Sequence, residues 1–366
     1  MKHFILILAA SVIVSACGST EPVRLGFLAS LSGRIADLAE DTRNGVLLSI
    51  EQQNLAGGIN GRIIEVVIRD DRSTPEGAAE GVAELAASGV AAIIGPITSS
   101  MAVAALPAAN KAKVVMVSPT VTSMQLVGQD DYLFRMNATT RDYARMYADF
   151  HYHRTGLRRV AIAMDIRNRA FSQSWLDEFQ PAFTALGGEI TTVVSFESAP
   201  EVAFSGIVEQ LVESRPDGLL FIAGTIDVVR LAQQAKRLSL EIPLVAVEWA
   251  ASEKLHELGG ADMEGLHVVE SYDRNDSSPR YTAFATAYRN RFRLEPGYTA
   301  VAAYEAATVI LDSLARRSPD QSLKEALISL GPFDGLQQPI RFDGYGDTTR
   351  KGYFVTMRDG RFVAEK

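Results

Sequence analysis

The chain has 366 residues, of which 47% are hydrophobic, and its 44 acidic and 36 basic side chains give a formal net charge of −8. This balance argues against a nucleic-acid partner, because phosphate backbones are bound by an excess of positive charge. The length and the apolar content suffice for two hydrophobic cores and exceed what one ordinary domain holds.

The first sixteen residues have the features of a targeting segment. Lys2 precedes an apolar run at residues 4–14 that is too short to span a bilayer, and V-S-A-C follows. This order resembles a bacterial lipoprotein signal, in which cleavage leaves an acylated cysteine at the N-terminus. Cys17 is the only cysteine, which excludes intramolecular disulfides and makes lipid attachment the best explanation of its position. We therefore expect residues 1–16 to be a signal peptide and Cys17 to be the lipidation site; an ordinary secretory signal is the alternative.

From Val23 onward, strand-like and helix-like segments alternate regularly. Residues 23–29 are almost entirely apolar, as expected for a strand buried in a parallel sheet. A small-residue loop leads to a helix expected at residues 38–55, which the glycines of residues 57–61 end before a second strand at residues 63–69. This order predicts a β-α-β unit with a right-handed crossover.

Asp70 and Asp71 follow the second strand, and a carboxylate pair suggests a catalytic or metal site. No third acid or histidine has a suitable spacing, however, and residues 73–76 begin another helix. We expect a loop and capping role, and no metal site. The chain also contains no G-x-G-x-x-G, G-x-x-x-x-G-K-[ST] or G-x-S-x-G motif, so it gives no support for nucleotide binding or a common serine hydrolase.

Two further strands, at residues 91–94 and 114–117, are each followed by a proline-bearing turn and a cluster of hydroxyl side chains. The first cluster, Thr98, Ser99 and Ser100, occupies the N-cap region of a helix expected at residues 101–110. Such a helix directs unpaired backbone N–H groups toward the carboxyl edge of the sheet, where small anions bind in open α/β folds. The hydroxyls therefore indicate a binding site, with simple helix capping as the alternative.

The same alternation of strands and helices begins again after Arg135. Strands are expected at residues 159–164, 189–196, 218–223 and 243–247, and helices near residues 142–153, 172–186, 202–213 and 227–238. Two more helices, at 277–290 and 298–316, precede a hairpin-like end at 340–366 with its turn at residues 358–361. Because the βα pattern is used twice, we predict an α/β protein with two doubly wound, flavodoxin-like lobes.

Three motifs resemble one known family. I-I-G-P-x-x-S-S lies at residues 93–100, V-x-V-S-P-T-x-T at residues 115–122 and Y-L-F-R at residues 132–135. Together they resemble the branched-chain amino-acid-binding (Leu/Ile/Val-binding) family of periplasmic solute receptors, and the resemblance extends over nearly the whole chain. It implies the type I periplasmic binding protein fold, in which two lobes joined by three crossovers close on a ligand.

The resemblance also implies a set of ligand-binding residues. Ser99 and Thr122 correspond to the residues that hold the ligand carboxylate and amine, and Ser100 and Thr120 stand beside them. Glu248 follows the strand at residues 243–247 and corresponds to an acid that pairs with the ligand ammonium, although it is also placed to cap a short helix at residues 250–258. The remaining candidates are Phe171 and Tyr298, at positions of ligand-contacting aromatic rings, and Thr225; simple packing of the two rings is the alternative.

The crossovers implied by the resemblance lie near residues 137–141, 271–273 and 344–347. We expect an N-terminal lobe of residues 22–138 plus 273–344 and a C-terminal lobe of residues 139–272 plus 345–366. Leu38 and Thr225 stand where the best-known members of the family have tyrosines, so leucine specificity does not carry over. An amino acid of another type, an amide or a carboxylate remains open.

The preferred interpretation is a lipid-anchored receptor, in the periplasm or at the cell surface, that delivers its small-molecule ligand to an ABC permease complex without a cofactor. A sensor of the same fold that signals to a partner without transport is the alternative. An enzyme is not expected, because no nucleophile, base and orienting group assemble from the motifs.

Overall fold

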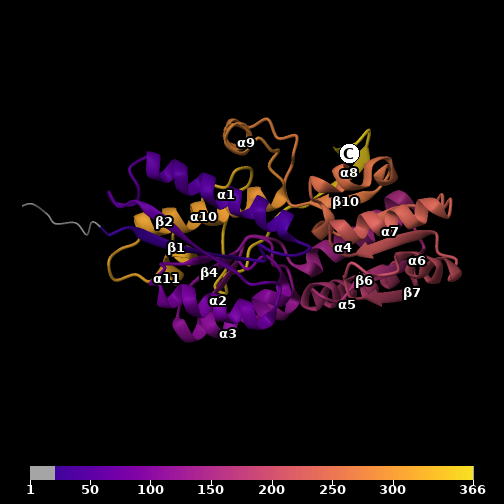
Figure 1. Ribbon diagram of the computed structural model, residues 1–366, viewed down its shortest axis with the longest axis horizontal. Coiled ribbons are helices and arrows are strands. Elements are labelled where there is room, and N and C mark those ends of the chain that lie inside the picture. Colours follow the sequence, from indigo (N-terminus) through magenta and orange to yellow (C-terminus); the bar gives the residue numbers. More distant parts are fainter. Residues whose placement is uncertain (1–20, 366) are drawn as a thin grey trace, which may run out of the picture.

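The computed structural model describes residues 21–365, which form two lobes arranged along the long axis of the molecule (Figure 1). Each lobe contains one sheet with helices packed against it. None of the helices formed by residues 21–365 has the length and apolar character needed to cross a membrane. The predicted signal peptide and Cys17 lie outside the described residues.

The sheet of the first lobe is parallel throughout, with the order β2-β1-β3-β4-β5. Its strands are β1 (Val23–Ala29), β2 (Ile64–Asp70), β3 (Ile93–Ile94), β4 (Met116–Ser118) and β5 (Leu133–Arg135). The helices of this lobe are α1 (Ala36–Leu55), α2 (Pro75–Ala87), α3 (Ser99–Ala112), α9 (Pro279–Phe292), α10 (Tyr298–Arg316) and α11 (Leu323–Ser329) (Figure 1).

The sheet of the second lobe has the order β12-β11-β10-β9-β8-β6-β7, parallel from β7 to β10 and antiparallel at β11 and β12. Its strands are β6 (Arg159–Asp165), β7 (Glu189–Phe196), β8 (Gly218–Ile222), β9 (Leu244–Ala246), β10 (His267–Glu270), β11 (Tyr353–Arg358) and β12 (Arg361–Ala364). Its helices are α4 (Thr140–Phe150), α5 (Arg169–Ala185), α6 (Phe204–Glu213), α7 (Thr225–Arg237) and α8 (Lys254–Gly259). Counted within each lobe, the first five strands have the order 2-1-3-4-5, so the predicted doubly wound, flavodoxin-like fold is confirmed.

Late helices complete the first lobe by packing on α1. The half-buried Asp41 carboxylate on α1 accepts hydrogen bonds from Tyr288 (2.6 Å) on α9 and from Thr299 Oγ1 (2.6 Å) and the Ala300 N–H (3.0 Å) on α10. Gly45 permits this contact, since a Cβ there would lie 2.3 Å from the Ala300 carbonyl oxygen. Segments more than 200 residues apart in sequence are thereby fixed against one another.

Several boundaries differ from those predicted. Helix α3 begins at Ser99 rather than residue 101, because Thr98 supplies the extended N-cap backbone. The helix expected at residues 250–258 is interrupted, and only a short 3-10 turn (Glu248–Ala250) and α8 form there. The final hairpin begins at Tyr353 instead of residue 340, while its predicted turn is correct. Positive φ angles at Asp359 and Gly360 give that turn the type I′ geometry that suits tight hairpins.

The paired Asp70 and Asp71 have the predicted loop role. Asp70 Oδ1 accepts from the Leu31 N–H (3.0 Å), and Asp71 Oδ1 accepts from the Ser30 hydroxyl (2.5 Å) and the Ser73 N–H (2.8 Å). These carboxylates hold the β1–α1 loop against the β2–α2 loop. No group of three or more histidine, cysteine or acidic side chains within residues 21–365 is arranged to hold a metal ion.

Candidate functional site

A small cavity of about 30 Å³ lies between the two lobes, at the carboxyl ends of strands from both sheets. Parallel α/β sheets place binding groups at this edge, because the loops after the strands converge there. The predicted site residues that line the cavity are Ser99, Thr120, Phe171, Glu248 and Tyr298. The other lining residues are Ile97, Asn137, Asn168 and Trp249.

The hydroxyl groups from the first lobe have different roles. Ser99 is the first residue of α3, and its Oγ accepts only a long hydrogen bond (3.4 Å) from the Ser123 N–H. The Thr120 hydroxyl instead donates to the Ile97 carbonyl (2.6 Å), which ties together the loops after β3 and β4. Ser99 is therefore freer than Thr120 to hydrogen-bond a ligand.

Thr122 and Ser100 do not line the cavity. The Thr122 side chain is buried, and its Oγ1 has no hydrogen-bond partner among the described residues. Ser100 spans the two lobes, because its N–H donates to Asn168 Oδ1 (3.0 Å) and its Oγ accepts from the Ala170 N–H (3.1 Å). Asn168 thus satisfies a backbone donor at the beginning of α3 from the opposite lobe.

Thr225 also lies outside the cavity wall. It is the first residue of α7, and its hydroxyl donates to the Ala250 carbonyl at 3.4 Å. The structure therefore brings Thr225 close to the turn that carries Glu248 and Trp249, without placing it on the surface of the cavity.

Glu248 is the strongest electrostatic feature of the cavity. It follows β9 and is only 6% exposed, and its Oε2 accepts from Trp175 Nε1 at 3.2 Å. Its Oε1 is buried with no hydrogen-bond partner among residues 21–365. Burial raises the pKa of the Glu248 carboxyl from an ordinary 4.5 to about 7, although hydrogen bonds from its own backbone N–H and from Trp175 act in the opposite direction. A buried oxygen of this kind favours a ligand that donates a hydrogen bond.

The sequence interpretation did not assign Asn137, Asn168 or Trp249 to the site. Asn168 belongs to the polar loop before Phe171. That loop is the only local sequence feature that could have indicated a binding role for Asn168. The Trp249 ring meets the Phe171 ring edge to face, with centroids 5.6 Å apart, and the Tyr298 hydroxyl donates to the Trp249 carbonyl at 3.4 Å. The ring contact lies within the second lobe, whereas the Tyr298 hydrogen bond arises from the approach of the two lobes, which no single segment encodes.

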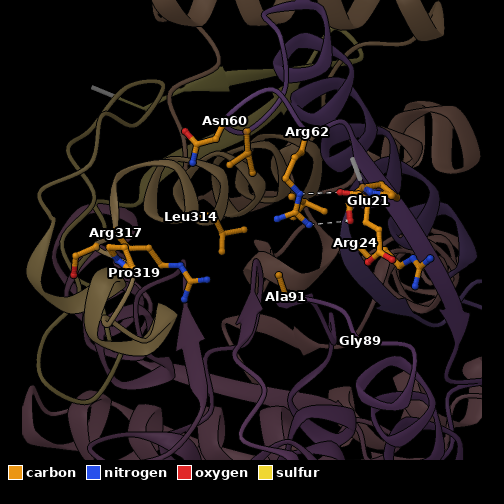
Figure 2. A pocket seen from close by; sticks show the side chains of 13 residues that line it. Glu21, Arg24, Asn60, Arg62, Gly89, Ala91, Leu314, Arg317 and Pro319 are labelled. Carbon is orange, nitrogen blue, oxygen red and sulfur yellow. Dashed lines mark hydrogen bonds between the residues drawn. The ribbon is translucent and has the colours of Figure 1, made fainter. Parts of the chain in front are cut away.

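A larger pocket, of about 410 Å³, lies at the start of β1 in the first lobe (Figure 2). Arg24, Arg62 and Arg317 contribute to its wall, and Arg62 Nε donates to the Glu21 carbonyl at 2.8 Å. None of the predicted site residues lines this pocket. We favour the smaller cavity because the ends of strands from both sheets and the buried carboxylate of Glu248 converge on it.

Two doubly wound lobes with polar groups gathered between them define the class of two-lobed α/β binding proteins. The chain belongs to the periplasmic binding protein family, whose model matches residues 22–361. The resemblance found in the sequence motifs is thereby confirmed. Members of this family are extracytoplasmic substrate-binding proteins and not enzymes, in agreement with the prediction.

Similar proteins include the leucine-, isoleucine-, valine-, threonine- and alanine-binding protein of Pseudomonas aeruginosa, which is 22% identical over 90% of this chain and 88% of its own length. The LivJ substrate binding protein of Streptococcus pneumoniae, solved in complex with isoleucine, has a TM-score of 0.87 at 24% identity and covers 94% of this chain and 99% of its own. A Rhodopseudomonas palustris solute binding protein in complex with benzoate has a TM-score of 0.85 at 19% identity, covering 94% and 95%. At these identities the structures show a shared fold.

Proposed function

We propose that this protein captures an α-amino acid between its lobes and delivers it to an ABC-type importer. The observation that carries the proposal is the buried, unpaired Oε1 of Glu248 in the interlobe cavity. An ammonium group supplies both the hydrogen-bond donor and the opposite charge that this oxygen lacks. The ligand carboxylate is then held from the other lobe by Ser99 and the amino end of α3, and by the unpaired Thr122 hydroxyl once opening of the lobes exposes it.

The lobes must open to admit such a ligand. A cavity of about 30 Å³ holds little more than a water molecule or two. Three connections link the sheets, between β5 and α4, between β10 and α9, and between α11 and β11, and we place the lobe boundaries there as predicted from the sequence. Three connections between two lobes permit hinge motion.

Attachment to the membrane through Cys17 belongs to the same proposal. It is supported by the signal-like order of residues 1–16 and by the position of the single cysteine directly after it. The anchor would hold the receptor at the membrane surface, within reach of an ABC permease. Mass spectrometry of the membrane-extracted protein tests this step, since an unmodified Cys17 would contradict it.

The ligand class is tested by a thermal-shift screen with amino acids and small carboxylates. A ligand that binds only the native state raises the unfolding midpoint by mass action, by about 2.7 kcal/mol in free energy at a hundredfold excess over its Kd. We expect at least one α-amino acid to raise the midpoint. If only compounds without an amine do so, the ligand class is wrong while the binding function stands.

An aromatic carboxylate is the second candidate, and the edge-to-face pair of Phe171 and Trp249 in the cavity wall favours it. The R. palustris solute binding protein with the same fold was solved with benzoate. Because the Glu248 pKa is about 7, its protonated form is available to donate a hydrogen bond to a carboxylate. The two candidates differ in pH dependence: from pH 6 to 8, affinity for an ammonium ligand should rise and affinity for an aromatic carboxylate should fall.

A further inference from the structure

A second pocket, of about 210 Å³, adjoins the cavity and shares Asn168 and Trp249 with it. Both lobes form its wall. Nine of its fourteen lining residues are polar, and besides Asn168 they are Ser32, Arg34, Arg72, Ser73, Thr98, Asp165, Arg167 and Ser198. A ligand held at Glu248 would extend its side chain past Trp249 into this outer pocket.

Arg34 is one of the three arginines that line the outer pocket. It belongs to the loop between β1 and α1, and its Nη2 forms an ion pair with Asp227 at the start of α7 in the other lobe. Only 18% of the Arg34 side chain and 5% of the Asp227 side chain are exposed. Arg34 Nε is buried and has no hydrogen-bond partner among the described residues. A guanidinium has five N–H donors in a fixed fork, so the pairing with Asp227 leaves donors for a ligand.

Three arginines, Arg34, Arg72 and Arg167, line this pocket against a single carboxylate. Asp165 is its lining carboxylate, and Asp165 Oδ1 accepts from the backbone N–H groups of Arg167 and Ser198, both at 3.0 Å. Arg167 Nη1 donates to the Ser198 carbonyl at 3.1 Å. The balance therefore favours a ligand group that brings oxygen acceptors. An aliphatic side chain would leave the buried Arg34 Nε without a hydrogen-bond partner.

We infer that the outer pocket binds the end of a ligand side chain that bears a carboxylate or carboxamide oxygen, and that Arg34 recognises it. This inference rests on the proposed amino-acid binding and narrows it to the acidic amino acids and their amides. The best-known members of the family have tyrosines at the positions of Leu38 and Thr225. Their replacement here accords with a pocket that does not select branched aliphatic side chains.

Calorimetry with L-glutamate, L-glutamine and L-leucine tests the inference on the full mature protein. We expect glutamate or glutamine to bind at least about a hundredfold more tightly than leucine, because a buried polar group discriminates strongly against a ligand that leaves it unpaired. Leucine binding as tightly as both polar ligands would overturn this inference and leave the proposed function intact. Failure of every α-amino acid to bind would overturn both.

Two variants separate recognition from lobe closure. Arg34→Lys keeps a positive charge near Asp227 but removes the Nε–H donor, so the preference for the polar ligand over leucine should fall by about tenfold or more. Asp227→Asn is the matched control: it removes the ion pair and leaves the guanidinium, so it should shift all affinities by a similar factor and keep the preference. If Arg34→Lys also shifts all affinities equally, Arg34 acts only in closure and the inference is wrong.

Discussion

The buried carboxyl of Glu248 offers a binding group to a ligand, but in its ionised form it lowers the stability of the ligand-free protein. Its pKa is raised to about 7 by burial, so between about pH 4.5 and 7 the folded protein retains a proton that the unfolded chain releases. This contribution to stability is fully present below the unfolded pKa and is lost as the pH rises through the folded pKa. At neutral pH and above, the ionised carboxylate destabilises the ligand-free protein.

The unfolding free energy of Glu248→Gln should therefore depend less strongly on pH than that of the parent protein. Relative to the variant, the parent should lose on the order of 3 kcal/mol of unfolding free energy between pH 4.5 and pH 8. Glu270 and Asp165, whose pKa values are raised to about 7 and about 6, occur in both proteins and cancel in the comparison. Urea unfolding of the two ligand-free proteins across this range provides the measurement, and parallel curves would contradict the account.

Ser99→Ala and Thr122→Val should weaken ligand binding without unfolding the protein. Each change removes a hydroxyl that has either a long hydrogen bond or none among the described residues, so the ligand loses a partner at a cost of roughly 1 to 3 kcal/mol. Thr120→Val is the informative comparison, because the Thr120 hydroxyl ties two loops and its loss should lower stability. A fall in ligand-free stability for Ser99→Ala, with affinity unchanged, would show that Ser99 is only a cap.

The site could be predicted best where a residue stands at the end of a local element. Ser99 and Tyr298 begin helices and Glu248 follows a strand, and all three line the cavity between the lobes. Asn168 and Trp249 escaped prediction, because their place in the site depends on contacts between lobes. The assignment of ligand roles to the predicted residues stays a prediction.

At the scale of elements, the sequence pattern predicted α10 with its correct ends, Tyr298 and Arg316. The pattern did not contain the docking of α9 and α10 on α1, because that contact joins distant segments through one carboxylate, Asp41. Short strands were the least accurate: β3 has two residues where four were expected, because Ala91 and Ala92 at its expected beginning are a bend and an irregular residue. The lobe boundaries remain predictions.

Asp41→Ala should destabilise the first lobe. The change leaves the Tyr288 and Thr299 hydroxyls and the Ala300 N–H without their common acceptor, so a loss of about 3 kcal/mol or more is expected. Glu40→Ala on the same helix is the control, because Glu40 is exposed and forms only a surface ion pair with Arg43. Equal stability of the two variants would refute the role of Asp41.

At the scale of the whole molecule, the lobes are in contact across the cavity. Ser100 bonds with Asn168, the Ser174 hydroxyl accepts from the Met124 N–H at 3.0 Å, and Arg34 pairs with Asp227. These contacts hold a closed arrangement, which must open for a ligand to enter. We expect ligand to stabilise this arrangement by contacting both lobes at once.

X-ray scattering should detect that closure. Saturation with a ligand of proven affinity should lower the radius of gyration, because the ligand shifts the population from open to closed forms. Asp227→Asn should enlarge the change by weakening closure without ligand. An identical radius with and without ligand, in both proteins, would argue against a hinge.

The central claim is that Glu248 meets a ligand ammonium in the closed cavity, and calorimetry on the parent and Glu248→Gln tests it most directly. Each protein is titrated with the amino acid found in the screen and with its analogue lacking the amine. We predict that the variant binds the amino acid at least several hundred-fold more weakly, since losing one member of a buried ion pair costs about 3 to 5 kcal/mol. The analogue should be affected far less, and equal losses for the two ligands would contradict the assignment.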